Sequence, residues 1–240
     1  MRTLAILPIK SFGAALQRLS GVLGGGSRRA LSQAMFLDVL AVLRRVRGID
    51  AVAVVTADPD AEAAARRGGV HLVGDPQHQG QSAAVGVGIR HALELGFERV
   101  LLVPGDTPLI DAGEIDAMLE RAEQEGTAAV IVPDRHGSGT NALLLAPPAA
   151  IAPSFGEDSL ERHRAHALAA GATHRVEAVA SLLLDVDTPA DLAELSEQLA
   201  ERRGQACVTR GALRQLDRSS RRAPIPVPPP VSAAHPGAVP

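Results

Sequence analysis

The sequence predicts a three-layer α/β fold with a mixed, mostly parallel sheet. Short runs of β-branched and aliphatic residues alternate with longer segments in which apolar residues recur every three to four positions. The first pattern is typical of strands buried on both faces, and the second of helices that cover a sheet. This alternation favours right-handed βαβ crossovers, which build a parallel sheet between two helical layers.

The elements follow from this pattern in order. The apolar run that ends at Pro8 predicts the first strand, and Leu31, Met35 and Val39 are spaced as the buried face of the first long helix. Pro189 suits the first position of the last helix, after Asp187 or Thr188 as its N-cap. We expect strands at 3–8, 51–56, 70–73, 100–103, 128–132, 142–145 and 182–185, and helices at 28–47, 60–67, 82–95, 115–125, 160–170 and 189–199.

Composition excludes several classes of function. The chain has no Trp or Tyr and only four Phe, so bases are not expected to stack on aromatic side chains. A net charge of −3 argues against nucleic acid as a partner. Because the apolar runs are too short to cross a bilayer and no secretion leader is found, we expect a cytoplasmic protein without membrane contact. The one cysteine, Cys207, excludes an internal disulfide and a multi-cysteine metal site.

The last 40 residues differ from the main domain, which we place at residues 1–200. Residues 201–222 contain seven Arg and two acidic residues, which predicts a basic extension, helical or disordered. Residues 223–240 hold seven of the seventeen prolines, so we expect a disordered Pro-rich tail, with a docking peptide as the alternative. Removal of the chain after Gly204 is expected to change neither melting temperature nor turnover.

Two loops at the carboxyl ends of predicted strands carry charge, and ligands of such sheets gather there. Lys10, the only lysine, and Arg18 follow the first strand; they suit a polyphosphate, although a lone lysine is as often a solvated surface residue. Asp106 follows the strand at 100–103 between two prolines, where it suits a hard cation or caps the next turn.

A second carboxylate pair ends the last predicted strand. Alternation places Asp185 and Asp187 on the same side of an extended segment. Helix capping by Asp187 or Thr188 is the alternative to a ligand role. Together with Asp106, this pair predicts a divalent cation whose shell is completed by phosphate oxygens.

Two further segments have the residue types of an anion site. The loop at 133–141 is rich in glycine and ends in Thr140 and Asn141, whose side chains are donors; a plain hairpin loop is the alternative. Gly156 and Ser159 open a helix, where amides and the helix dipole favour a phosphate or carboxylate, or where they only cap it.

The histidines do not indicate a nucleophile or a metal site. His163 is interpreted as a partly buried structural histidine. His136, His163 and His166 lack a metal-ligand spacing with acidic partners, and no Ser/His/Asp arrangement is found.

The chain resembles the guanylyltransferases of coenzyme F-420 biosynthesis in six segments taken in order: LPIKSFGAALQRL, RRAL through MFLDVL, GDTPLI, DRHGSGTNALLL, FGEDSLERH and LDVDTPADL. That family comprises 2-phospho-L-lactate guanylyltransferase and its phosphoenolpyruvate-using bacterial relatives. The resemblance covers about residues 3–197. The segments GTN, FG-x-x-S and DVDTPADL are together specific, whereas GDTPL is shared with many nucleotidyltransferases. The resemblance implies a GT-A-like nucleotidyltransferase (MobA-like) fold, with GTP as a substrate and magnesium as the cofactor.

The resemblance also implies a role for each matching residue. Magnesium would be held by Asp106, Asp185 and Asp187, and the phospho-acid by Thr140, Gly156 and Ser159. The nucleotide would be bound by Pro8, Lys10, Arg18, Gly80 and Ser82, with Lys10, Arg18 and Asp106 as the catalytic set. The chain departs from the family pattern at Leu16, where a lysine is usual, and at residues 80–84, GQSAA in place of GLNAA. Gln81 and Ser82 still suit a purine edge, so guanine is the expected base.

The implied reaction is guanylyl transfer. The acceptor phosphate attacks the α-phosphorus of GTP and diphosphate leaves, which requires positioning and charge neutralisation rather than a general base. Phosphoenolpyruvate is the favoured acceptor, with 2-phospho-L-lactate and 3-phospho-D-glycerate as alternatives. The competing functions are another nucleotidyltransferase, with CTP or a molybdopterin-type acceptor, and a non-catalytic GTP-binding regulator. Expected partners are a downstream transferase of the coenzyme pathway and a second copy of the chain in a homodimer.

Overall fold

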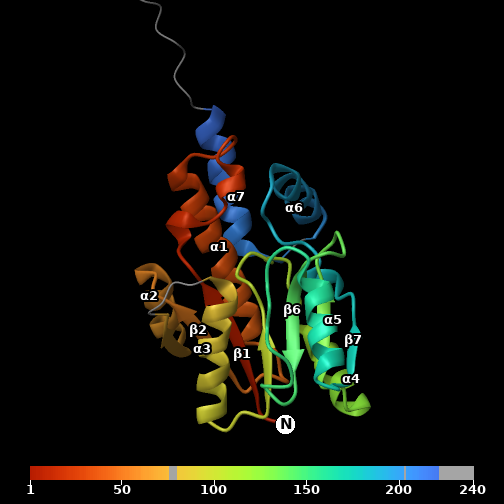
Figure 1. Ribbon diagram of the computed structural model, residues 1–240. Coiled ribbons are helices and arrows are strands. Elements are labelled where there is room, and N and C mark those ends of the chain that lie inside the picture. The colour runs from red at the N-terminus through yellow and green to blue at the C-terminus, as the bar shows by residue number, and fades with distance from the viewer. Residues whose placement is uncertain (76–79, 203, 222–240) are drawn as a thin grey trace, which may run out of the picture.

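Seven strands form one sheet in the order β3-β2-β1-β4-β6-β5-β7. The computed structural model describes residues 1–75, 80–202 and 204–221 and is shown in Figure 1. The strands are β1 (Thr3–Ile9), β2 (Ala51–Thr56), β3 (His71–Gly74), β4 (Arg99–Leu102), β5 (Ala129–Pro133), β6 (Thr140–Leu145) and β7 (His174–Val176). Only β6 runs antiparallel to its neighbours, β4 and β5, among the described strands. The predicted mixed, mostly parallel sheet is confirmed.

Helices cover both faces of the sheet, as the strand pattern requires. Alternate residues of β1 point to opposite layers: Ala5 and Leu7 pack with one set of helices, and Leu4 and Ile6 with the other. The first layer contains α1 (Gly25–Leu43), α2 (Pro59–Gly68) and α4 (Ala112–Glu125), and the second contains α3 (Gln81–Glu94) and α5 (Ser159–Ala169). No helix in the described part of the chain is long and apolar enough to span a bilayer.

One glycine sets how closely α3 approaches the sheet. A Cβ on Gly88 would lie 2.6 Å from the Cγ2 atom of Ile6 and 3.1 Å from that of Val55. A side chain there would push α3 away from β1 and β2. Because α3 begins beside the loop that follows β1, this contact also fixes part of the wall of the site.

The predicted strand at 182–185 is wrong. This segment consists of a 3₁₀ turn, η3 (Ala180–Leu182), and a loop, whereas the seventh strand is β7, at the edge of the sheet next to β5. Leu182, Leu184 and Val186 are buried, so their alternation reflects packing without strand pairing. The short, half-exposed sequence HRV of β7 has no apolar alternation by which it could be found.

The basic extension contains a helix that packs on the domain. Figure 1 shows α7 (Cys207–Arg221) beside α1, with α6 (Pro189–Glu201) nearby. Asp38 of α1 is buried, and its carboxylate accepts the N–H groups of Val208 (3.2 Å) and Thr209 (2.7 Å) at the start of α7. Leu213 packs against the apolar cluster that α1 and α6 share. These contacts contradict the expectation that the chain after Gly204 contributes nothing to stability; the Pro-rich tail at 223–240 lies outside the described residues.

Truncation after Gly204 is therefore expected to lower the melting temperature, because it uncovers apolar side chains of α1 and removes the partners of Asp38. Asp38→Ala should reproduce part of the loss, since removal of an N-cap costs about 1 kcal/mol. Truncation after Arg221, which keeps α7, is the matched control and should melt as the full chain does. Equal melting temperatures for both truncations would instead support the expectation from composition that residues after Gly204 do not stabilise the domain.

Candidate active site

The predicted substrate loops meet at one edge of the sheet. β1 and β4 are adjacent and parallel, so the loops after Ile9 and Leu102 leave the sheet side by side, at a topological switch point. Because β6 is antiparallel to β4, its first residue, Thr140, lies at the same edge. The reversal of one strand thus adds the start of β6 to a site formed by strand ends.

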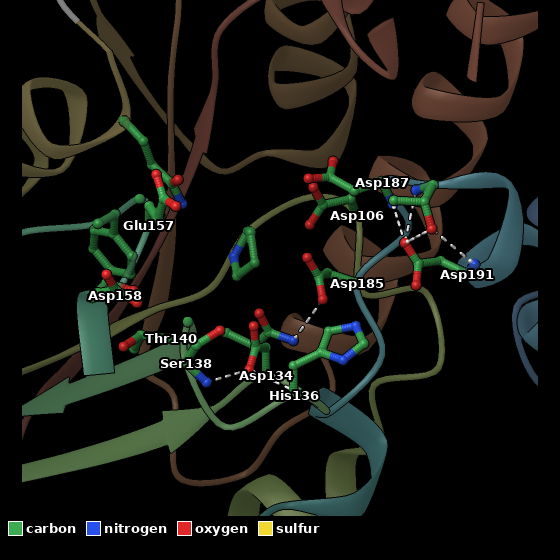
Figure 2. A pocket seen from close by; sticks show the side chains of 18 of the residues that line it. Asp106, Asp134, His136, Ser138, Thr140, Glu157, Asp158, Asp185, Asp187 and Asp191 are labelled. Atoms are coloured by element: carbon green, nitrogen blue, oxygen red, sulfur yellow. Dashed lines mark hydrogen bonds between the residues drawn. The ribbon is translucent and has the colours of Figure 1, made fainter. Parts of the chain in front are cut away.

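Two adjoining cavities open at this edge. The larger has a volume of about 570 Å³ and contains seven of the predicted residues: Arg18, Asp106, Thr140, Gly156, Ser159, Asp185 and Asp187 (Figure 2). The smaller, of about 250 Å³, is lined by Pro8, Lys10 and Gly80. Gln81, Pro104 and Asp106 line both cavities. Asp106 therefore lies where a ligand of one cavity would meet a ligand of the other.

The structure describes all the predicted site residues. Of these, only Ser82 lines neither cavity. Its Oγ accepts the N–H of Phe155 at 2.9 Å. Phe155 belongs to the segment that leads into α5, so this bond joins the start of α3 to the wall of the larger cavity. Leu16 is buried with Leu19 and Leu31, and so the departure from the family's lysine adds an apolar contact beside the site.

Asp106 is a buried carboxylate among other carboxylates. Its Oδ1 atom is buried and has no hydrogen-bond partner among the described residues. Burial, and then the charges of Asp185 and Asp187, raise the pKa of Asp106 to about 7. Burial also raises the pKa of Asp185, against the hydrogen bond that it accepts from Asn141 Nδ2 at 3.2 Å. Such a pair lacks the positive charge that would stabilise its ionised form.

The two residues proposed as caps of the last helix have separate roles. Thr188 is the N-cap of α6: its Oγ1 accepts the Asp191 N–H at 3.3 Å, and Asp191 accepts the Thr188 N–H at 2.7 Å. Arg135 binds the other carboxylate oxygen of Asp191. The capping alternative thus holds for Thr188. The Asp187 carboxylate lines the cavity and lies 3.6 Å from Arg18, with both side chains largely exposed.

The aspartates fit a cation that is shared with a substrate. Among the described residues, no three His, Cys, Asp or Glu side chains come close enough to hold a metal ion by themselves. Magnesium is commonly bound by one or two carboxylates, with water and substrate phosphates completing its shell. The unpaired, buried oxygen of Asp106 and the neighbouring Asp185 fit that mode. Binding of magnesium by the three aspartates stays a prediction.

The segment before α5 is shaped for an anion. Gly156 has a φ of +110°, a conformation that favours glycine. Arg162 holds this segment from behind through Ser154 Oγ (2.9 Å) and the Phe155 carbonyl (3.2 Å). The Ser159 N–H donates to the Gly156 carbonyl at 3.2 Å. The Gly156 N–H and the Ser159 hydroxyl make no hydrogen bond to the described chain, and both residues line the cavity.

The sequence suggested that Asn141 donates to a bound anion, but its side-chain amide is already hydrogen-bonded within the chain. Its Nδ2 donates to the carbonyls of Leu182 (2.8 Å) and Leu183 (3.1 Å) and to Asp185 Oδ1 (3.2 Å). Asn141 is buried and therefore tethers the segment that carries Asp185. The loop that precedes it joins the antiparallel strands β5 and β6, as the hairpin alternative expected, and Asp134 Oδ1 accepts N–H bonds from within it.

His163 is more deeply buried than the sequence indicated. It is 0% exposed and lies behind Thr140, with its Nδ1 atom 3.0 Å from Thr140 Oγ1. Its Nε2 atom accepts the Ser154 N–H at 2.8 Å. Burial, first of all, lowers the pKa of His163 to about 4. The interpretation of His163 as a structural histidine is thus consistent with these contacts.

Asp75 is a site residue that the sequence reasoning missed. It follows β3, is 3% exposed and lines the smaller cavity. Its Oδ1 is buried without a hydrogen-bond partner among the described residues. A carboxylate directly after an apolar run is the signal that identified Asp106, so the same rule applied to the strand at 70–73 would have found Asp75.

The chain is similar in sequence to known proteins over most of its length. The family model described as "Guanylyl transferase CofC like" matches residues 3–217. A phosphoenolpyruvate guanylyltransferase from Conexibacter woesei is 50% identical over 92% of this chain and 99% of its own, and one from Sphaerobacter thermophilus is 40% identical over 82% and 93%. A 2-phospho-L-lactate guanylyltransferase from Methanothermobacter thermautotrophicus is 33% identical over 81% and 84%.

Solved structures show the same fold. A putative nucleotide-diphospho-sugar transferase from Desulfovibrio desulfuricans superposes with a TM-score of 0.70 at 18% identity, over 92% of this chain and 98% of its own. A nucleotidyl transferase from Methanothermobacter gives 0.60 at 18% identity, over 83% and 98%. The predicted nucleotidyltransferase fold is confirmed.

Asp106→Asn is expected to stabilise the metal-free protein increasingly as the pH rises. Between pH 4 and 7 the folded protein holds a proton on Asp106 that the unfolded chain has released, because the folded pKa is about 7; stability therefore falls as the pH rises. Asparagine lacks this dependence. In EDTA the variant should melt like the wild type near pH 4 and roughly 10 °C higher at pH 8, because a pKa difference of about 3 between the folded and unfolded states is worth about 4 kcal/mol.

The control for the lost charge is Asp158→Asn, which changes an exposed carboxylate of the same cavity. Its melting temperature should follow that of the wild type over the whole pH range. A difference between Asp106→Asn and wild type that stays constant from pH 4 to 8 would contradict the raised pKa.

Proposed function

This chain belongs to the family of CofC-like guanylyl transferases, and we propose that it transfers GMP from GTP to the phosphate of phosphoenolpyruvate. It is a nucleotidyltransferase of coenzyme F-420 biosynthesis. The observation that carries the assignment of two substrates is the pair of cavities that share Asp106. Phosphoenolpyruvate ranks above 2-phospho-L-lactate because the relatives named for it are 50% and 40% identical, against 33%. 3-Phospho-D-glycerate is the third acceptor to test.

The larger cavity would receive the phospho-acid. Its wall contains the Gly156 amide and the Ser159 and Thr140 hydroxyls, which are neutral donors suited to an oxyanion. Figure 2 shows Thr140 apart from Asp106 and Asp187, on the other side of the view, so an acceptor bound to this wall would direct its phosphate toward Asp106.

The smaller cavity would receive GTP. Lys10, at the end of β1, faces this cavity and provides a cation for the phosphates, while Arg18 lies at the larger one. Asp75 adds a buried carboxylate to the lining of this cavity. A carboxylate accepts two parallel N–H groups, which guanine presents on its N1 and 2-amino positions and adenine does not. Asp75 thus supports guanine as the base.

Negative charge makes a cation necessary. The larger cavity is lined by seven carboxylates and one arginine, and both substrates are polyanions. Magnesium held at Asp106, Asp185 and Asp187 would neutralise phosphate charge at the point where the substrates meet. With the charge neutralised, the residues of the chain need only orient the two phosphates.

The reaction then proceeds in line. An oxygen of the acceptor phosphate forms a bond to the α-phosphorus of GTP while the bond from that phosphorus to the bridging oxygen of the diphosphate breaks. The attacking phosphate is already ionised at neutral pH, so no side chain has to remove a proton. This agrees with the described site, in which no Ser, Cys or His is arranged as a nucleophile. Lys10 and Arg18 stabilise the charge that develops on the phosphates.

Two alternatives stay distinct from this proposal. A CTP-dependent or molybdopterin-type enzyme of the same fold would use another base or acceptor, and a regulator would bind GTP without transfer. Magnesium dependence, a homodimer, a downstream transferase as partner and a cytoplasmic location are part of our proposal.

A substrate panel tests the function. Purified protein is mixed with magnesium, GTP or CTP, and each of the three phospho-acids in turn, and diphosphate release is measured. We expect release with GTP and fastest release with phosphoenolpyruvate. Asp106→Asn, which should fold but lose turnover, is the control for contaminating activity. Binding of GTP without diphosphate release in any mixture would favour the regulator.

A pair of variants tests the assignment of the two cavities. Ser159→Ala removes a hydrogen bond to a charged group, about 1.5–3 kcal/mol, and should raise the KM for the phospho-acid about ten- to a hundredfold. The KM for GTP should stay within about twofold, and Lys10→Ala should show the opposite pattern. Equal losses for both substrates in both variants would mean that the subsites are drawn wrongly.

A further inference from the structure

We infer that His163 is a positioning residue: it donates a hydrogen bond to Thr140 Oγ1 and so leaves the Thr140 hydroxyl proton free for an oxyanion of the acceptor. The inference rests on the proposed function for the identity of that acceptor. The hydrogen-bond geometry on which it depends is independent of the reaction.

The tautomer of His163 follows from one backbone bond. The N–H of Ser154 lies 2.8 Å from His163 Nε2, and a backbone N–H can only donate. Nε2 must therefore be the unprotonated nitrogen, and Nδ1 carries the proton of the neutral ring. A doubly protonated ring would set two N–H groups against each other, and the lowered pKa of the buried ring agrees with the neutral form.

The proton on Nδ1 decides what Thr140 can do. Nδ1 lies 3.0 Å from Thr140 Oγ1, so His163 donates and the threonine oxygen accepts. The hydroxyl proton of Thr140 then has no acceptor among the described residues, while Thr140 lines the larger cavity. With the other tautomer, Thr140 would donate to the ring and offer only a lone pair, which repels a phosphate or carboxylate.

Several contacts hold the ring in this orientation. His163 is completely buried, and the Phe155 ring packs edge-on against it at 5.1 Å between centroids. Ser154, its hydrogen-bond partner, is itself bound by Arg162 through Nε to Oγ at 2.9 Å. The ring therefore cannot turn over without breaking the segment that contains Gly156. One side chain thus connects the anion segment before α5 to the first residue of β6.

Two substitutions separate the two nitrogen positions. In His163→Asn the side-chain amide lies near the Nδ1 position and can still donate to Thr140, but nothing accepts the Ser154 N–H. In His163→Gln the amide lies near the Nε2 position and can accept the Ser154 N–H, but the donor to Thr140 is lost. Glutamine also fills more of the space of the ring, so a role in packing alone would favour Gln over Asn.

We expect the opposite ranking for the acceptor. The KM for phosphoenolpyruvate, or for whichever acid the wild type uses, should rise about tenfold in His163→Gln and by no more than about threefold in His163→Asn. The KM for GTP should stay within about twofold in both. In a Thr140→Val background the difference between Asn and Gln should vanish, because the hydroxyl that His163 orients is absent. Melting temperatures show whether each variant is folded.

The tautomer is also measurable without turnover. In the wild-type protein labelled with ¹⁵N-histidine, NMR should show His163 protonated on Nδ1 and unprotonated on Nε2 at pH 7.5, with the signal assigned by its absence from His163→Gln. A proton on Nε2, or a Gln variant with an acceptor KM equal to or below that of Asn, overturns the inference. Absence of transfer by the wild type with every acid would instead refute the proposed function, and the NMR result would still decide the tautomer.

Discussion

Repulsion between negative charges is the constraint under which this site is built. In the proposed reaction two polyanionic substrates would meet beside Asp106. Its buried Oδ1 has no partner among the described residues, and burial and two further aspartates raise its pKa to about 7. A buried carboxylate of this kind destabilises the folded protein when it ionises without a cation. In the proposed function a cation together with phosphate oxygens would relieve both the repulsion and the missing contacts.

The strand directions of the sheet bring the residues of the site to one edge. Parallel strands β1 and β4 deliver Lys10 and Asp106 to one edge, and the antiparallel strand β6 starts at that edge with Thr140. A wholly parallel sheet would have placed the start of β6 at the opposite end. One reversed strand thus brings Thr140, which we propose to bind the phospho-acid, to the edge that contains Lys10, which we propose to bind GTP. The Ser82–Phe155 hydrogen bond joins the start of α3 to the segment before α5.

The sequence predicted the parts of the fold that follow from periodicity, and the site residues that follow from strand ends. Apolar alternation does not separate burial from strand pairing, so it predicts a strand at 182–185, where there is none, and gives no signal for β7, with its sequence HRV. Nor could the sequence show which polar side chains are already bonded. Asn141 has a side chain that could donate a hydrogen bond to an anion, yet its amide donates to the carbonyls of Leu182 and Leu183 and to Asp185. The packing of α7 depends on Asp38, 170 residues away in sequence from Val208, and no local pattern reports such a contact.

The difference between polar groups that are hydrogen-bonded within the chain and those that are not also explains how the site is kept rigid. Hydrogen bonds inside the described chain from Asn141 Nδ2, Arg162 and His163 hold the segments in place. Groups that line the cavities, such as the Gly156 amide, the Ser159 hydroxyl and Asp106 Oδ1, have no partner there. Unpaired polar groups persist in a folded protein only where the surrounding contacts keep them from relaxing toward one another. The proposed substrate binding therefore requires the buried hydrogen bonds behind the cavity as well as the groups that face it, because those bonds fix the backbone segments on which the free donors stand.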